Sequence, residues 1–131
     1  MRNISKFIGL AFFSLALSTS LANADEIKSI SGGIGEEGRE IIKNERNNYS
    51  LEIIFTGNEG MYLSEIAVKI ADKKGNIVFE TTTDGPILLV NLPKGDYVVN
   101  ADAEDQHLKQ DLKLAGGKNQ TSYLRFNIKK Q

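Results

Sequence analysis

Apolar and polar residues alternate along most of the chain from residue 48 onward. Between Tyr49 and Thr56, the apolar Tyr49, Leu51, Ile53 and Phe55 occupy every second position. A period of two is typical of a β-strand with one buried face. The same period recurs in four later segments, residues 77–81 are expected as the returning strand of a hairpin, and a continuous apolar run over residues 87–90 is typical of a strand buried on both faces. The pattern therefore predicts seven strands, at residues 49–56, 66–71, 77–81, 87–90, 97–102, 108–114 and 123–128.

Short segments rich in Gly, Pro, Asn and Asp separate these strands. Residues 72–76 and 83–86 have the composition of turns, and we expect the second to close a hairpin with the strand before it. Residues 92–95 form another turn, in which proline presets the backbone. Short strands at even spacing with no long helix between them indicate an all-β, antiparallel, seven-stranded sandwich rather than a parallel sheet.

The segment before the strands has a different character. Ser31 to Gly35 contains three glycines and is expected to interrupt regular structure. Glu36 to Arg46 is predicted to form one short helix, because acidic residues stand at its first turn and basic residues near its last. We therefore expect an N-terminal arm with this helix over residues 25–47, followed by the sandwich over residues 48–131.

Residues 1–24 have the pattern of a signal peptide. Arg2 and Lys6 precede the uncharged apolar run 7–17, and Ala22 and Ala24 supply small residues before a cleavage point between Ala24 and Asp25. The apolar run is about half the length of roughly 20 residues that a membrane-spanning helix needs. The sequence thus predicts an exported protein, periplasmic or secreted, without membrane insertion.

Charge and composition exclude several functions. Of the 16 basic residues, Arg2 and Lys6 lie in the signal segment, so the remainder carries 14 against 17 acidic residues. A mildly acidic chain is a poor partner for nucleic acid, which requires clustered cations. There is no cysteine, which removes disulfides and thiolate chemistry, and His107 is the only histidine. We expect no cofactor and no metal.

The turn and strand motifs together resemble a known group. The matching motifs are Tyr62-Leu63, Ile66-x-Val68-x-Ile70-x-Asp72-x-x-Gly75, Asp84-Gly85-Pro86-x-Leu88-Leu89, and Leu92-Pro93-x-Gly95-x-Tyr97-x-Val99. They are similar to the carboxypeptidase regulatory-like, transthyretin-like (prealbumin-like) domains, and within that group to small exported bacterial proteins that carry a Gly-Gly-Ile-Gly segment. The resemblance implies a Greek-key sandwich whose fold depends on Leu92, Pro93, Gly95, Tyr97 and Val99. It implies no particular activity, because such sandwiches serve as accessory modules, adhesin stalks and carriers.

Few residues are candidates for a functional site. Tyr97 is interpreted as a packing tyrosine whose hydroxyl binds nearby backbone. Gly32, Gly33, Ile34 and Gly35 expose backbone that could pair with a sheet edge, and Tyr62 is a candidate recognition aromatic. These five residues form the predicted interaction segment, with no catalytic or metal-binding residue assigned.

Three functions remain open. The first is a non-enzymatic interaction module that binds an envelope protein or a glycan, with homodimerisation by edge pairing as a further option. The second is carbohydrate binding of the starch-binding type, for which only Tyr62 and Tyr123 offer exposed rings. The third is a small hydrolase at His107, for which the sequence nominates no partner. Asp102, Glu104 and Asp105 lack the spacing of a Ca²⁺ loop.

Overall fold

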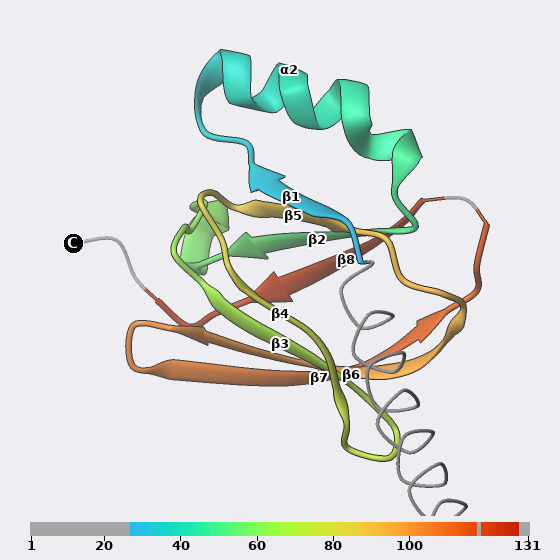
Figure 1. Ribbon diagram of the computed structural model, residues 1–131. Coiled ribbons are helices and arrows are strands. Elements are labelled where there is room, and N and C mark those ends of the chain that lie inside the picture. The colour runs from blue at the N-terminus through green and yellow to red at the C-terminus, as the bar shows by residue number, and fades with distance from the viewer. Residues whose placement is uncertain (1–26, 118, 129–131) are drawn as a thin grey trace, which may run out of the picture.

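The computed structural model describes residues 27–117 and 119–128, and in these residues two four-stranded sheets pack face to face (Figure 1). The predicted signal peptide, with the cleavage point between Ala24 and Asp25, lies outside the described residues. No helix in the described part of the chain is long and apolar enough to cross a membrane. The elements are β1 (Ser29–Gly32), α2 (Gly35–Glu45), the 3-10 turn η1 (Arg46–Asn48), β2 (Leu51–Thr56), the 3-10 turn η2 (Asn58–Gly60), β3 (Ala67–Asp72), β4 (Ile77–Thr82), β5 (Ile87–Val90), β6 (Gly95–Ala103), β7 (Gln106–Leu114) and β8 (Gln120–Arg125).

The two sheets have the strand orders β1-β5-β2-β8 and β4-β3-β6-β7. The all-β prediction is confirmed, but two details of it are wrong. The described residues contain eight strands rather than seven, because Ser29–Gly32 pairs with β5 instead of forming an irregular arm. Among the described strand pairs, β2 and β8 run parallel, with Leu51 opposite Gln120, whereas an entirely antiparallel sandwich was expected.

The hydrophobic core lies between the sheets and follows the predicted alternation. In β6, Tyr97, Val99 and Ala101 are buried, whereas Asp102 is exposed. Residues 88–90 are all buried, as the continuous apolar run predicted. The core also contains Leu51, Ile53, Phe55, Ile66, Val68, Ile70, Leu112, Leu114, Leu124 and Phe126.

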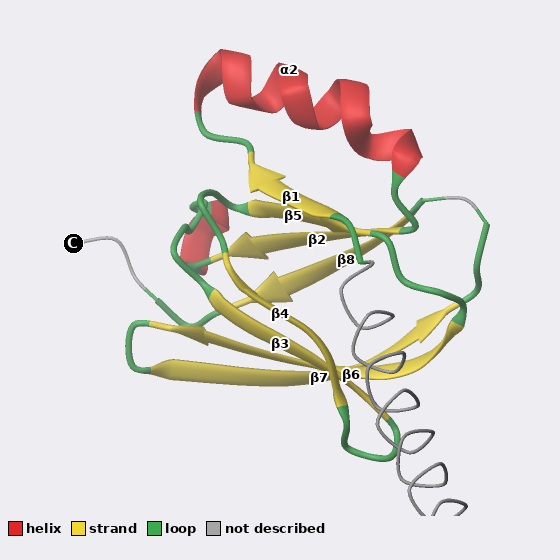
Figure 2. Ribbon diagram, in the orientation of Figure 1, coloured by secondary structure: helices red, strands yellow, loops and turns green. Residues whose placement is uncertain are grey.

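The helix α2 lies against β1, at one edge of the β1-β5-β2-β8 sheet and on the side away from the other sheet (Figure 2). Both β1 and β2 are antiparallel to β5, which lies between them, so β1 and β2 run in the same direction. Two strands of the same direction need a crossover connection, and α2 supplies it. Within α2, whose residues are all described, Ile42 is the one buried side chain. Leu89, on the outer face of β5, is also fully buried, and α2 lies on the same side of the sheet.

The segment before β5 corrects another prediction. Residues 83–86 do not close a hairpin, because β4 and β5 belong to different sheets and the chain crosses between them here. Thr83 is buried and its Oγ1 accepts a hydrogen bond from the backbone N–H of Ile66 at 3.0 Å. Gly85 lies so close to the strand β1 that a Cβ at this position would overlap the carbonyl group of Gly32. The crossing is therefore held against β1 by backbone contact.

Tyr97 has the role that the sequence indicated. It is buried, and its hydroxyl donates a hydrogen bond to the carbonyl oxygen of Pro93 at 2.6 Å. Burial, and secondarily the negative charge of Asp72, raises the pKa of the Tyr97 hydroxyl above its usual value. The hydrogen bond joins the start of β6 to the turn before it.

Candidate functional site

Tyr62 is an exposed aromatic ring on a well-fixed stretch of backbone. Its neighbour Leu63 is buried and donates its backbone N–H to the carbonyl of Phe55 at 3.3 Å, and Tyr62 itself forms a β-bridge with Thr56. Because side chains alternate along extended backbone, burial of Leu63 directs Tyr62 to the outer face. The side chain of Tyr62 is 68% exposed. The backbone at Tyr62 is therefore fixed, while its ring is left exposed to solvent.

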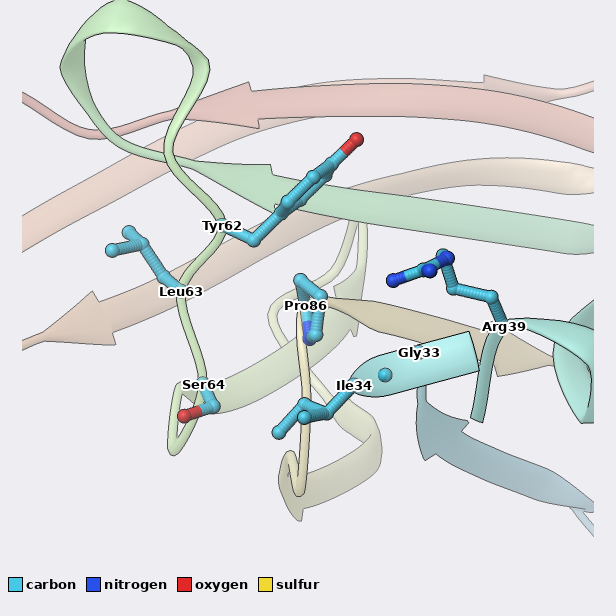
Figure 3. Close-up of a pocket in the computed structure, with 8 residues that line it drawn as sticks. Gly33, Ile34, Arg39, Tyr62, Leu63, Ser64 and Pro86 are labelled. Atoms are coloured by element: carbon cyan, nitrogen blue, oxygen red, sulfur yellow. The ribbon is translucent and has the colours of Figure 1, made fainter. Parts of the chain in front are cut away.

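The chain beyond β1 forms the opposite side of a hollow next to Tyr62. Gly33, Ile34 and Gly35 lead from β1 into α2, and together with Arg39 they face Tyr62 across Pro86 (Figure 3). The hollow has a volume of about 330 Å³ and is also lined by Leu63 and Ser64. Gly33 has a φ of 98°, and a Cβ there would lie 3.0 Å from Ile87. Glycine is therefore required for this turn.

A second hollow, of about 360 Å³, continues from the first over the outer face of β2 and β8. Its floor includes Ile54 and Tyr123, which lie opposite each other in the β2–β8 pairing. Two residues further along both strands, Thr56 pairs with Arg125, so Arg125 lies on the same sheet face as Tyr123. Tyr123 is 67% exposed, because the neighbouring Leu124 takes the core-facing position.

We call the two adjoining hollows the outer groove. They share Gly33, Arg39, Tyr62 and Pro86. Each has the size of an ordinary ligand pocket, which is about 300–1,000 Å³. Tyr62 and Tyr123 flank β2 from opposite sides and two residues apart along it, which places their Cα atoms about 12 Å apart at standard strand spacing and rise.

The charge of the outer groove is positive. Arg39 and Arg46 line it, and among the described residues that line it none is acidic. The carboxylates directly next in sequence to lining residues are not themselves among the lining residues; they are Glu36, Glu40, Glu45, Glu59 and Glu65.

Arg46 has a carboxylate partner beneath the groove. Its Nε lies 2.9 Å from Oε1 of the buried Glu52, and its Nη2 donates to Oε2 at 3.2 Å. The Nε–H itself is not aligned with an acceptor in the described structure, so that contact is coulombic. Glu52 is polar and lies between the apolar positions of β2, yet it is buried, because Arg46 of η1 lies over it. Arg39 is thus the groove-lining cation that the described contacts leave available to a ligand.

The glycine-rich segment does not offer a free strand. Ser29–Gly32 is already paired with β5, and the backbone N–H of Asp84 donates to Oγ of Ser31 at 2.9 Å. The remaining residues of the predicted interaction segment, Gly33, Ile34 and Gly35, meet Tyr62 at the outer groove. The structure therefore brings most of the predicted segment together, around a hollow rather than along an edge.

His107 lies far from this groove in the topology, on the β4-β3-β6-β7 sheet. Its Nδ1 is 2.7 Å from Oδ1 of Asp102, the residue opposite it on β6, and both side chains are more than half exposed. The described hydrogen bonds of His107 and Asp102 include none to a serine or another nucleophile. The described residues also contain no cluster of three or more metal-ligating side chains.

Several groove residues were missed by the sequence reasoning. Arg39, Pro86, Ile54 and Thr56 gave no signal, because each has the pattern of an ordinary helix, turn or strand residue. Tyr123 was identified only as a possible sugar platform, with no link to Tyr62. A search for exposed aromatics alone would have found the two tyrosines but not their common groove.

Comparison of the chain with protein-family models and with curated proteins finds no significant match.

Proposed function

We propose that this protein is a non-enzymatic binding module of the exported β-sandwich type, and that it holds its ligand in the outer groove. The observation that carries the proposal is the convergence of Gly33, Arg39, Tyr62 and Tyr123, from three separate parts of the chain, on adjoining hollows. Exposed aromatic rings and arginine are the side chains enriched where proteins bind partners. The backbone that carries each ring is fixed by β-pairing, so little backbone entropy is lost when a ligand binds.

The contacts of the described residues favour binding over catalysis. An acid–base or nucleophilic mechanism needs a base within hydrogen-bond reach of the group that it activates. His107 and Asp102 make such a contact, but they lie on an exposed hairpin and not in a hollow of the outer groove. The outer groove has tyrosine, threonine and arginine side chains and no carboxylate or histidine among its described lining residues. These groups can bind a ligand but lack a general base at neutral pH.

Carbohydrate is the second, narrower candidate. Sugar rings present C–H faces that pack on aromatic rings, while their hydroxyls stay hydrated or form hydrogen bonds at the rim. Tyr62 and Tyr123 are both about two-thirds exposed and share one hollow. This pairing favours a glycan over an unspecified envelope protein.

The fold and location are part of the same proposal. The motifs around Leu92, Pro93 and Tyr97 support a transthyretin-like Greek-key sandwich, as do four crossings of the chain between the two sheets from β2 to β8. The apolar run and the small residues before Asp25 support export. Intact mass of the exported protein should then correspond to a chain beginning at Asp25.

The binding proposal is tested with a glycan array and an envelope pull-down, each run with the exported protein and two variants. Tyr62→Ala removes a ring from the outer groove, whereas Ile77→Ala removes a side chain that is 51% exposed on β4 of the other sheet. We expect Tyr62→Ala to lose about tenfold in affinity for the recovered ligand and Ile77→Ala to bind as wild type. Equal binding by both variants would place the ligand elsewhere, and the absence of any ligand would argue against a binding module.

A further inference from the structure

We infer that the ligand of the outer groove is a sugar chain that carries carboxylate groups. This inference rests on the proposed binding function and specifies the chemistry of its ligand. It combines two properties of the same surface, namely its positive charge and its two separated rings.

The charge of the groove is opposite to that of the protein. The whole chain has a net charge of −1, yet the described lining of the outer groove contains no acidic residue. Arg46 lines the groove but is paired with the buried Glu52, so Arg39 is the lining cation that remains for a ligand. Arg125 lies beside the groove rather than in its lining, opposite Thr56 on the same sheet face, and adds a second cation near it. Guanidinium groups bind carboxylates through two parallel hydrogen bonds, a geometry that a neutral ligand cannot match. Local cations on an acidic protein therefore select for an anionic ligand.

The spacing of the rings favours a chain over a single small anion. The Cα atoms of Tyr62 and Tyr123 are about 12 Å apart across β2, with Ile54 and Thr56 between them. A single sugar ring cannot cover both tyrosines, but a short oligosaccharide can place one ring on each. Arg39 stands on the α2 side of this path, and Arg125 on the β8 side. The carboxylate of one sugar would then contact Arg39, and that of a following sugar would contact Arg125.

An acidic peptide fits this surface less well. Extended peptides gain much of their affinity by adding a strand to a free sheet edge. The floor of the groove is β2, whose two edges are already paired with β5 and β8. A peptide lying here would leave its backbone N–H and C=O groups without strand partners. A sugar chain has no such requirement, since its hydroxyls can stay in contact with water.

The test uses matched probes and isothermal titration calorimetry with the full exported protein. The probes are trimers of galacturonate and of mannuronate, the methyl esters of the same trimers, and tetraglutamate. Esterification removes the charge and keeps the rings, whereas tetraglutamate keeps the charge and has no rings. We expect at least one uronate trimer to bind, its ester to bind at least tenfold more weakly, and tetraglutamate to bind more weakly still. Salt at 1 M, which shortens the Debye length to about 3 Å, should reduce uronate binding.

Two variants locate the interaction. Arg39→Gln should weaken uronate binding roughly fivefold and leave ester binding unchanged, because only the charged contact is lost. Lys109→Gln, on β7 of the other sheet, removes the same charge elsewhere and should bind as wild type. Equal affinity for acid and ester would overturn the inference while leaving a neutral-glycan module intact. Equal affinity for tetraglutamate would overturn it in favour of a peptide, and absence of binding by both uronates would overturn it outright.

Discussion

The attachment of α2 to the sheet should depend on a single side chain. Ile42 is 1% exposed and is the one buried residue of this fully described helix, whereas the adjacent Ile41 is 54% exposed. Ile42→Ala and Ile41→Ala make the same chemical change one position apart on the same helix. The second variant is therefore a matched control for helix propensity, and the difference between the two measures burial alone.

The expected magnitude follows from the carbon atoms removed. Isoleucine to alanine deletes three carbons, which at about 0.8 kcal/mol per buried CH₂ amounts to roughly 2.4 kcal/mol. The cavity that remains adds to this, within the range of about 2–5 kcal/mol for such substitutions. Alanine returns a few tenths of a kcal/mol through its higher helix propensity at both positions. We expect Ile42→Ala to lower the free energy of unfolding by about 2–4 kcal/mol and Ile41→Ala to leave it unchanged or slightly higher.

Urea denaturation followed by circular dichroism measures both values. With a slope of about 1–3 kcal/mol per molar urea, the midpoint for Ile42→Ala should fall by about 1–2 M. Hydrogen exchange adds the location of the loss. Amides that join β1 to β5 should lose protection in Ile42→Ala before those of β6, because α2 packs on β1 at the edge of its sheet.

The result that refutes this reasoning is equal stability of the two variants, within about 0.5 kcal/mol. It would mean that the helix is not held to the sheet by its apolar contact. The arrangement of Arg39 in the outer groove would then lose its structural support, because α2 carries that residue.

Two further predictions concern the close approach of Gly85 to β1 and the hydroxyl of Tyr97 at the start of β6. Gly85→Ala should destabilise the fold by at least about 2 kcal/mol in urea denaturation, because the added Cβ overlaps the Gly32 carbonyl group. Gly38→Ala in α2 is the control and should stabilise the fold by about 0.5–1 kcal/mol. Similar effects at both sites would contradict the close approach of Gly85 to Gly32. The pKa of Tyr97 is raised by burial, so its contribution to stability is fully present below pH 10 and is lost as the pH rises through the folded-state pKa. Tyr97→Phe should lower the free energy of unfolding by about 1 kcal/mol at pH 7, because the hydrogen bond to Pro93 is lost. The variant should also lose less stability than the wild type as the pH rises above 10. If both proteins lose the same stability above pH 10, other groups cause that loss.

Much of the sandwich was predictable because strand faces are a local property. The alternation over residues 97–102 identified the buried face of β6, and Leu92-Pro93-x-Gly95-x-Tyr97 located the corner at its start. Helix α2 was also placed to within one residue at each end, from the charges at its two ends. Each of these signals is contained in fewer than a dozen consecutive residues.

The errors share one cause, which is that partners are chosen over long sequence distances. Ser29–Gly32, with the sequence Ser-Ile-Ser-Gly, has little strand propensity of its own and becomes a strand because β5, nearly sixty residues later, offers an open edge. Glu52 is polar but buried, because η1 returns Arg46 to the same face. Neither fact is visible in the alternation of β2.

The sequence alone determined the seven strand segments after residue 48 and the faces that they bury, because these follow from side-chain period and backbone preference within a few residues. Only the tertiary structure decided that β8 runs parallel beside β2, that β1 extends the sheet, and that α2 lies against β1. These arrangements of β8, β1 and α2 bring Arg39 and Tyr123 to the groove beside Tyr62. Their contact depends on the register of strands far apart in the chain, and no local pattern encodes that register.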